Sequence, residues 1–427
     1  MSKGFSVETI PTLPPDALFG LKSRCQADPR ENKVDLGIGA YRDNAGKPWI
    51  LPVVKKVESS ITKEPNYNHE YLAISGLSTF TSGAAKVLLG DDSPVIAENR
   101  ISSTQTLSGT GALHVAGLFI KHFYKSPSES SSSSSEEKPT IYISKPTWGN
   151  HIQMFEFIGY KIEYYPYWND ETKTLEFEKL IDFIKSAPKN SIFLLHSCAH
   201  NPTGLDPSRE QWKSILEALD ANDHLPFFDS AYQGFASGSL ENDAYAVRLA
   251  ANSNNYKFPL VICQSFAKNV GMYGERVGAV HVVLPKTDIE LNKAISSQLS
   301  KIIRSEISNP PSYGAKIVSK IINDKSLMQE WQENMVEMSS RIKKMRLKLR
   351  DELNRLETPG NWDHIVNQVG MFSFTGLKPK QVETLEKEFG IYMLGTGRIS
   401  IAGLNDSNVT YVAESINKVV SEIPTHI

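Results

Sequence analysis

The chain has 427 residues, of which 40% are hydrophobic and 22% charged, and its formal net charge is −2. This composition is typical of a globular enzyme with one large or two modest domains. A near-neutral charge provides no basic surface that could displace counterions from nucleic acid, and no apolar run has the length of a membrane span. We therefore expect small molecules or proteins as partners, and neither nucleic acid nor a membrane.

The cysteines and the first residues bear on the cellular compartment. Cys25, Cys198 and Cys263 are scattered and have no CxxC spacing, which indicates neither a disulfide framework nor a zinc site. The chain reaches Leu13-Pro-Pro-Asp-Ala-Leu18 too early for a signal peptide or an Arg-rich presequence. These features predict a cytoplasmic protein.

Short apolar segments alternate with longer amphipathic ones, which predicts an α/β domain. The predicted buried strands cover residues 140–144, 191–196, 225–229 and 258–263. Each of them runs directly into a polar cluster. Because ligands of open α/β sheets bind beyond the carboxyl ends of the strands, these clusters are candidates for chemistry.

The segment Ser108-Gly-Thr-Gly-Ala112 precedes a predicted helix at 113–123. Its amides and hydroxyls would lie at a helix N-terminus, where anions are stabilised. It lacks the third glycine of a dinucleotide fingerprint and the Gly-Lys-Ser/Thr ending of a Walker loop, which disfavours a dehydrogenase or an NTPase. Taken alone, the segment is explained more simply as a tight turn that caps the helix.

Two changes of composition indicate the domain organisation. Residues 126–139 are rich in Ser and Glu, which predicts a polar loop insertion between a helix and a strand. Residues 335–356 carry a run of basic side chains, which favours a solvated helix face over a binding site. This helix is expected to lead into a second, smaller domain with strands at 370–376 and 399–403.

The strand predicted at 191–196 is followed by His196-Ser-Cys-Ala-His200 and then Asn201-Pro-Thr-Gly204. The two histidines lie at a strand end and in a loop, not on one helix face, and no third ligand is nearby, so we expect no metal site. The Pro-Thr-Gly turn is suited to present Asn201 into a cleft.

Two further strand ends carry charged side chains. Asp229 could keep a pyridine nitrogen protonated, or it could simply cap the next helix. Lys268 becomes a useful nucleophile if burial beside a cation lowers its pKa, and Arg276 could supply that charge and bind phosphate. Ser265-x-x-Lys268 also matches the nucleophile motif of serine penicillin-binding enzymes, but the Ser-Asp-Asn and Lys-Thr-Gly elements of that class are missing.

Together these motifs resemble the fold type I aminotransferases. The matching elements are Asn201-Pro-Thr-Gly204, Asp229-Ser-Ala-Tyr232, Ser265-Phe-Ala-Lys268 with Arg276, and Arg398. Further stretches narrow the resemblance to the eukaryotic aspartate aminotransferase branch and its fungal cytosolic members, namely Leu36-Gly-Ile-Gly39-Ala-Tyr-Arg42, Tyr67-Asn-His-Glu-Tyr71, Lys145-Pro-Thr-Trp148, Ser305-Glu-Ile-Ser-Asn309-Pro-Pro311 and residues 370–376. The resemblance covers residues from about 11 to 420 and departs only at the Ser-rich insertion.

The resemblance implies an α/β protein with the fold of type I PLP-dependent transferases: a large domain with a mostly parallel sheet flanked by helices, and a smaller α/β domain. The large, cofactor-binding domain would cover residues 50–325. The small domain would combine 15–49 with 326–427. Residues 1–14 would form an arm that contacts the partner subunit of a homodimer.

The resemblance also implies that Lys268 carries pyridoxal 5′-phosphate as a Schiff base and later moves a proton. Asp229 would pair with the pyridinium nitrogen, with His151 and His196 behind it. The other residues expected around the cofactor ring are Tyr232, Asn201 and Trp148. The groups expected at its phosphate are Ser108, Gly109, Thr110, Ser265 and Arg276. Tyr71 is expected to reach in from the other subunit as a catalytic and cofactor-binding residue.

For the substrate, the resemblance implies that Arg398, Gly39 and Asn201, beside Trp148, bind the α-carboxylate. Arg304 of the other subunit would bind the distal carboxylate. The expected activity is reversible, ping-pong amino-group transfer between L-aspartate and 2-oxoglutarate, giving oxaloacetate and L-glutamate. One alternative is an aminotransferase that prefers aromatic amino acids. Another is a cofactor-free binding protein that keeps the fold without turnover.

Overall fold

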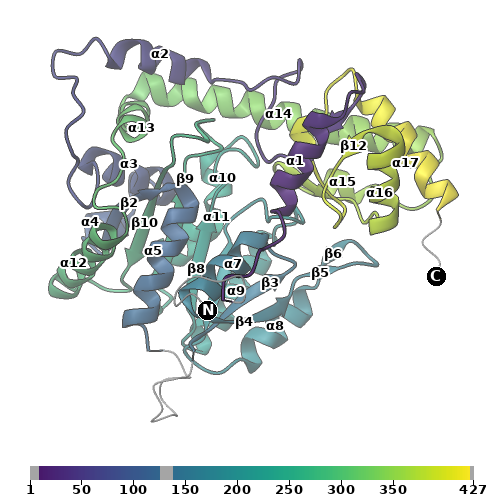
Figure 1. Cartoon of the computed structure of the whole chain (residues 1–427). Helices are drawn as coiled ribbons and strands as arrows, with labels where there is room; N and C mark the ends of the chain where they lie inside the picture. Colours follow the sequence, from purple (N-terminus) through teal and green to yellow (C-terminus); the bar gives the residue numbers. More distant parts are fainter. Residues whose placement is uncertain (1–8, 126–137, 424–427) are drawn as a thin grey trace, which may run out of the picture.

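The computed structural model describes residues 9–125 and 138–423. Most of the predicted Ser-rich insertion and the first part of the predicted arm lie outside these residues. A seven-stranded sheet forms the centre of the molecule (Figure 1). In sheet order its strands are β2 (Ile101–Leu107), β10 (Val277–Val283), β9 (Leu260–Ser265), β8 (Leu225–Ser230), β7 (Ile192–His196), β3 (Thr140–Lys145) and β4 (Lys161–Pro166).

The sheet is mostly parallel, because only β10 runs antiparallel to its two neighbours. All residues of β7, β8, β9 and β10 are buried, as expected for strands covered on both faces. Alternate residues serve opposite cores: Phe193 and Leu195 pack on one face, and Ile192 and Leu194 on the other. All four strands predicted from the apolar runs are present, with bounds that differ by one or two residues.

Helices cover both faces of the sheet. One face is covered by α5 (Ser108–Phe123), α7 (Gly149–Ile158) and α12 (Ile289–Glu306). The other is covered by α3 (Ser78–Leu89), α4 (Pro94–Ala97), α8 (Phe177–Ser186), α9 (Arg209–Ala221) and α11 (Tyr245–Asn252). The helices α2 (Pro52–Ile61), α10 (Leu240–Asp243) and α13 (Tyr313–Asn323) also belong to this part of the molecule, and their buried residues form part of a separate apolar cluster. We call this assembly the sheet body.

The two ends of the chain meet in a second group of elements, the terminal lobe. Here β1 (Val34–Asp35) pairs in parallel with β12 (Ile391–Tyr392), and β11 (Phe372–Phe374) pairs antiparallel with β13 (Arg398–Ser400). The lobe also contains α1 (Ala17–Ala27), α15 (His364–Asn367), α16 (Pro379–Phe389), the 3₁₀ turn η1 (Ile401–Gly403) and α17 (Val409–Glu422). A small hairpin of the sheet body, β5 (Trp168–Asn169) and β6 (Thr174–Leu175), reaches the lobe through the Asp170–Lys378 ion pair of 2.7 Å.

The long helix α14 (Lys325–Arg355) connects the sheet body to the terminal lobe (Figure 1). It begins at Asp324, whose carboxylate accepts hydrogen bonds from the amides of Ser326 and Leu327, each at 2.9 Å. Its buried residues recur every three or four positions and form one apolar stripe. They include Trp331, Met335, Met338, Ile342, Met345, Leu349 and Leu353.

Some expectations from the sequence are wrong in detail. The basic run of α14 is not uniformly a solvated face, because Arg346 lies on the buried stripe and is only 2% exposed. The strand expected at 399–403 ends at Ser400, where the ladder with β11 reaches its first residue, Phe372. The chain then turns, and the amide of Leu404 donates to the carbonyl of Ile401.

Candidate active site

A cavity of about 340 Å³ opens at the carboxyl ends of the parallel strands, between the sheet body and the terminal lobe. Most of the side chains predicted from the sequence line it. They are Gly39, Ser108, Gly109, Thr110, Trp148, His196, Asn201, Asp229, Tyr232, Ser265, Lys268, Arg276 and Arg398. His151 is fully buried directly behind this set, in contact with Asp229.

Asp229 has one oxygen engaged and one free. Its position on β8 is opposite His196 of β7, and its Oδ2 lies 3.0 Å from Nε2 of His151. Burial raises the pKa of Asp229, but the hydrogen bond from His151 and nearby positive charges outweigh it, so the pKa lies below its ordinary value. Its Oδ1 is buried and has no hydrogen-bond partner in the described chain. Such an oxygen is costly unless a ligand supplies a donor.

A chain of polar groups fixes the two histidines behind Asp229. The Nδ1 of His151 lies 2.9 Å from the hydroxyl of Thr147, which is 3.4 Å from Nε2 of His196. The Nδ1 of His196 accepts from the amide of Asn201 at 3.2 Å. Burial lowers the pKa of His196 to about 3, so this ring is neutral at neutral pH and its proton is on Nε2.

Lys268 lies in the loop after β9, with its Nζ 5.0 Å from the ring centroid of Tyr232. Loss of hydration lowers the pKa of the lysine amine. Asp229 opposes this change and Arg276 adds to it. The result is an amine that is more readily deprotonated than a surface lysine, as nucleophilic and proton-transfer chemistry requires.

Three segments converge on an anion site. The helix α5 begins at Ser108, five residues earlier than predicted, so Ser108, Gly109 and Thr110 form its first turn. The hydroxyls of Ser108 and Ser265 are 2.9 Å apart, and the amide of Ser108 donates to the carbonyl of Arg276 at 3.0 Å. Ser108 holds a left-handed φ of 61°, an unfavourable conformation for a residue with a side chain. A helix N-terminus with two hydroxyls and a guanidinium beside it is suited to a phosphate.

Arg398 of β13 projects from the terminal lobe into the same cavity. It is 5% exposed, donates from Nη2 to the carbonyl of Gly37 at 2.8 Å, and has a buried Nε without a partner among the described residues. Burial lowers its pKa to about 10, so it remains a cation at neutral pH. Its Cζ lies 4.1 Å from the ring centroid of Phe372. A cation with a free donor here is suited to a carboxylate.

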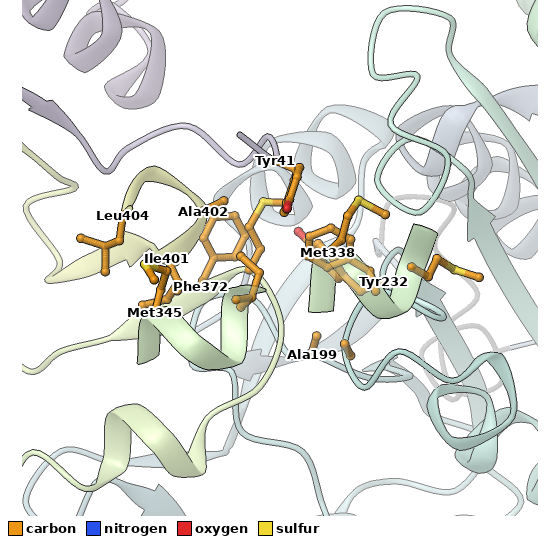
Figure 2. Packing of buried hydrophobic residues seen from close by; sticks show 14 of the residues in the cluster. Tyr41, Ala199, Tyr232, Met338, Met345, Phe372, Ile401, Ala402 and Leu404 are labelled. Carbon is orange, nitrogen blue, oxygen red and sulfur yellow. The ribbon is translucent and has the colours of Figure 1, made fainter. Parts of the chain in front are cut away.

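Asn201 is presented by a turn that a partly buried acid supports. Ala199 has a left-handed φ of 48°, and the Asp206 carboxylate accepts from the amides of Ala199 and His200 at 2.6 and 3.0 Å. Figure 2 shows Ala199 and Tyr232 on one side of the apolar cluster that borders the cavity, and Phe372, Ile401 and Ala402 on the other. The cavity walls therefore come from both parts of the molecule.

Two of the predicted site residues are not in this cavity. Tyr71 is 87% exposed. Arg304 is also exposed, and its Nη1 donates to Ser308 Oγ at 2.5 Å. The expectation that both serve another subunit's site stays a prediction.

Sequence reasoning also missed residues that line the cavity. Tyr273 receives a hydrogen bond of 2.8 Å from the amide of Tyr41, and Phe372 packs on Arg398. Phe372 lies within the 370–376 motif and Tyr273 lies between Lys268 and Arg276, so proximity to the predicted motifs is the sequence signal for both. Leu18 and Phe19 of α1 also line the cavity, and no local signal in the sequence distinguishes them from other apolar residues.

Within residues 9–125 and 138–423, no group of three or more His, Cys, Asp or Glu side chains is arranged to hold a metal ion. In the same residues, none of the helices combines the length and the apolar character needed to cross a membrane.

The family model for aminotransferase class I and II matches residues 31–416. The chain belongs to this family. The expected fold of type I PLP-dependent transferases is thereby confirmed. Class I and II aminotransferases are enzymes that depend on pyridoxal 5′-phosphate.

Comparison with individual aminotransferases gives a consistent result. The chain is 54% identical over 413 residues to the cytoplasmic aspartate aminotransferase of Saccharomyces cerevisiae, covering 96% of each chain. It is 46% identical to the cytoplasmic aspartate aminotransferase of Gallus gallus, covering 97% of this chain and 98% of that one.

Two solved aminotransferase structures extend the comparison. The aspartate aminotransferase from Saccharomyces cerevisiae cytoplasm has a TM-score of 0.92 at 53% identity, covering 98% of this chain and 99% of that one. An aromatic-amino-acid aminotransferase from Burkholderia pseudomallei, covalently bound to pyridoxal phosphate, has a TM-score of 0.90 at 36% identity, covering 98% of this chain and all of the other.

Proposed function

We propose that this aminotransferase acts in the cytoplasm and transfers the amino group of L-aspartate to 2-oxoglutarate, reversibly, giving oxaloacetate and L-glutamate. The observation that carries the proposal is one cavity that holds Lys268, Asp229 with a free oxygen, and Arg398 with a free donor. A relative named as a cytoplasmic aspartate aminotransferase is 54% identical over 96% of this chain. The identity to an aromatic-amino-acid aminotransferase is lower, at 36%, which favours aspartate over aromatic amino acids as the substrate.

Pyridoxal 5′-phosphate fits the chemistry of the cavity. The unpartnered Oδ1 of Asp229 is suited to accept a hydrogen bond from a protonated pyridine nitrogen. Tyr232 and Asn201 would bind the phenolic oxygen, and Trp148 would stack on the ring. The phosphate would be held by Ser108, Gly109, Thr110, Ser265 and Arg276. When bound, the cofactor supplies an electron sink for negative charge at the substrate Cα.

The residues of the chain supply positioning and proton transfer. Lys268 would anchor the cofactor and then, with its lowered pKa, take the proton from the substrate Cα and deliver it to C4′ of the cofactor. Asp229 would keep the ring nitrogen protonated, and the neutral His196 together with His151 would hold the carboxylate in place. Arg398, Gly39 and Asn201, beside Trp148, would orient the α-carboxylate.

We also propose a homodimer with composite sites. Arg304 would bind the distal carboxylate of a dicarboxylic substrate in the neighbouring subunit, and Tyr71 would bind the cofactor and take part in catalysis there. The exposure of both side chains supports this proposal, because neither has a role in the cavity of its own chain.

The proposed domain division follows the same reasoning. Residues 50–325 would form the large domain, 15–49 with 326–427 the small domain, and 1–14 an arm on the partner, of which residues 1–8 lie outside the described structure. The pairing of β1 with β12 supports a small domain built from both ends of the chain.

The absorption spectrum of the purified protein tests the proposal. We expect a visible band from bound cofactor that changes on addition of L-aspartate and returns with 2-oxoglutarate. Lys268→Ala should keep the phosphate and ring contacts, and so bind the cofactor, but lose nearly all turnover. Replacing the exposed Lys213 by Ala is the matched control and should change neither cofactor binding nor turnover. Transamination at a near wild-type rate in Lys268→Ala would refute the role of the lysine.

A further inference from the structure

Arg346 of α14 is a buried cation without a counter-ion. Its side chain lies on the stripe of Ile342 and Leu349, inside the terminal lobe, and it forms no ion pair within residues 9–125 and 138–423. Burial lowers its pKa to about 9, which still leaves it charged at neutral pH. A buried charge is costly unless hydrogen bonds compensate for the lost water, so the hydrogen-bond partners of Arg346 must supply that compensation.

All three hydrogen bonds of Arg346 go to backbone carbonyls of one short segment. Its Nη1 donates to Ile365 at 2.8 Å, and its Nη2 donates to Gly370 at 2.9 Å and to Phe372 at 2.5 Å. The planar guanidinium thus spans residues 365–372, which lead from α15 into β11. A lysine could not hold the same set, because its ammonium is a single point of charge.

This segment forms one wall of the proposed carboxylate pocket. The Phe372 ring lies 4.1 Å from Cζ of Arg398, and Phe374 and Arg398 are paired across β11 and β13. A Cβ on Gly39 would come within 2.7 Å of the Phe372 ring, so the ring fills the space beside this glycine. A shift of Phe372 would therefore move the surface on which Arg398 rests.

The same segment also touches the turn that presents Asn201. The amide of Val369 donates to the carbonyl of Gly204 at 2.7 Å. Gly370 packs so closely that a Cβ there would come within 2.4 Å of Cβ of Ala199. Residues 369–372 thus connect Arg398 in the terminal lobe with Asn201 in the sheet body.

We propose that Arg346 is a positioning residue for the substrate α-carboxylate: by holding the carbonyls of Gly370 and Phe372, it sets Arg398 against Asn201. This inference rests on the α-carboxylate role proposed above for Arg398. Three charge-assisted hydrogen bonds offset part of the cost of burying the cation, whose Nε has no partner among the described residues, and the geometry of the pocket depends on them.

The test compares Arg346→Met with Arg100→Met in the holoenzyme. Arg100 is 3% exposed and also donates to a backbone carbonyl, that of Leu284, but it precedes β2 at the end opposite Ser108. The probe is succinate, a dicarboxylate without an amino group, whose dissociation constant is measured by titration calorimetry. The Michaelis constants for L-aspartate and L-alanine, the cofactor spectrum and the melting temperature are measured alongside.

We expect Arg346→Met to raise the succinate dissociation constant and both Michaelis constants about tenfold or more, the order expected when charge-assisted hydrogen bonds are lost. The turnover number should fall less, and the cofactor spectrum should stay unchanged. Arg100→Met should lower the melting temperature without weakening succinate binding. Arg346→Lys keeps the charge but loses the planar guanidinium. Its succinate dissociation constant and Michaelis constants should lie between those of wild type and Arg346→Met.

Succinate affinity within about twofold of wild type in a folded Arg346→Met, with only a lower melting temperature, would overturn the inference. If the Met variant does not fold, Arg346→Lys decides: the dissociation constant must rise at least about threefold, and an unchanged constant counts against the proposal. Arg398→Lys tests the α-carboxylate role of Arg398 separately. Unchanged succinate affinity in this variant would overturn both that role and the positioning role of Arg346.

Discussion

Asp206 is partly buried in the sheet body, where its carboxylate accepts hydrogen bonds from two backbone amides and forms no ion pair in the described chain. Burial raises the pKa of Asp206 to about 6, although the two amides act in the opposite direction. The turn that presents Asn201 is therefore supported by an acid whose ionisation disfavours the folded state.

The resulting pH dependence has a definite sign. The folded pKa lies above the unfolded value of 3.8, so the contribution of Asp206 to stability is present below pH 4 and is lost as the pH rises through 6. The difference in unfolding free energy between wild type and Asp206→Asn should thus fall by about 2 kcal/mol from pH 4 to pH 7. Urea titrations of both proteins across this range measure it. A difference that does not change with pH would contradict the assignment.

The two arginines proposed to bind substrate predict different specificity effects. Arg304 offers two parallel hydrogen bonds to a distal carboxylate, and sites built on such a contact reject ligands that lack it by roughly 10⁴-fold. Arg304→Asp should therefore collapse kcat/KM for aspartate and improve the relative rate with basic amino acids.

Arg398→Lys is the matched control for that experiment. Its partner, the α-carboxylate, is common to all amino acids, so its replacement should depress every substrate and leave their ranking intact. If Arg304→Asp weakens aspartate and alanine equally, the specificity for dicarboxylates must come from other residues.

The elements illustrate what can be predicted from the sequence. The strands β7, β8 and β9 could be predicted because strands buried on both faces are continuous apolar runs. The strand β3 could be predicted because its buried Ile141 and Ile143 alternate with less buried residues. Most of the candidate site could then be predicted as well, because polar residues after such strands meet at one edge of the sheet.

Other features depend on contacts that local sequence does not encode. The burial of Arg346 could not be foreseen, because a basic residue within a basic run is indistinguishable from its solvated neighbours until the apolar stripe is placed in space. Leu18 and Phe19 were missed for the same reason, since only the packing of α1 brings them to the cavity. The end of β13 at Ser400 is set by its partner β11 and not by its own residues.

At the scale of elements, the Ser-rich insertion between α5 and β3 gives a further prediction. Its composition provides few apolar contacts, and loop length changes stability by only about 0.6 kcal/mol per doubling. Deleting residues 128–137 should leave the specific activity and the melting temperature nearly unchanged. Replacing the same residues by Gly and Ser at full length is the control. A large loss in the deletion alone would show that the length of the connection matters.

At the scale of the whole molecule, the composite site predicts complementation between inactive subunits. A heterodimer of Lys268→Ala and Arg304→Ala subunits would have one doubly damaged site and one intact site. Random exchange of equal amounts should restore about a quarter of the wild-type activity.

Mixing Lys268→Ala with Asp229→Asn is the control for complementation. Both residues serve their own subunit's site, so activity should not return. If the first mixture also stays inactive, although native mass spectrometry detects heterodimers, the proposal of composite sites is wrong.

The pairing of β1 with β12 also determines the order in which the protein can mature on the ribosome. Residues 34–35 emerge early but have no strand partner until residues 391–392 have been synthesised. The sheet body, with Ser108, Asp229 and Lys268, is complete well before that point, and domains fold as units as they emerge. On the proposed roles, a nascent chain would assemble the phosphate and ring contacts before Arg398 is added, and so would bind cofactor before it could recognise an amino acid.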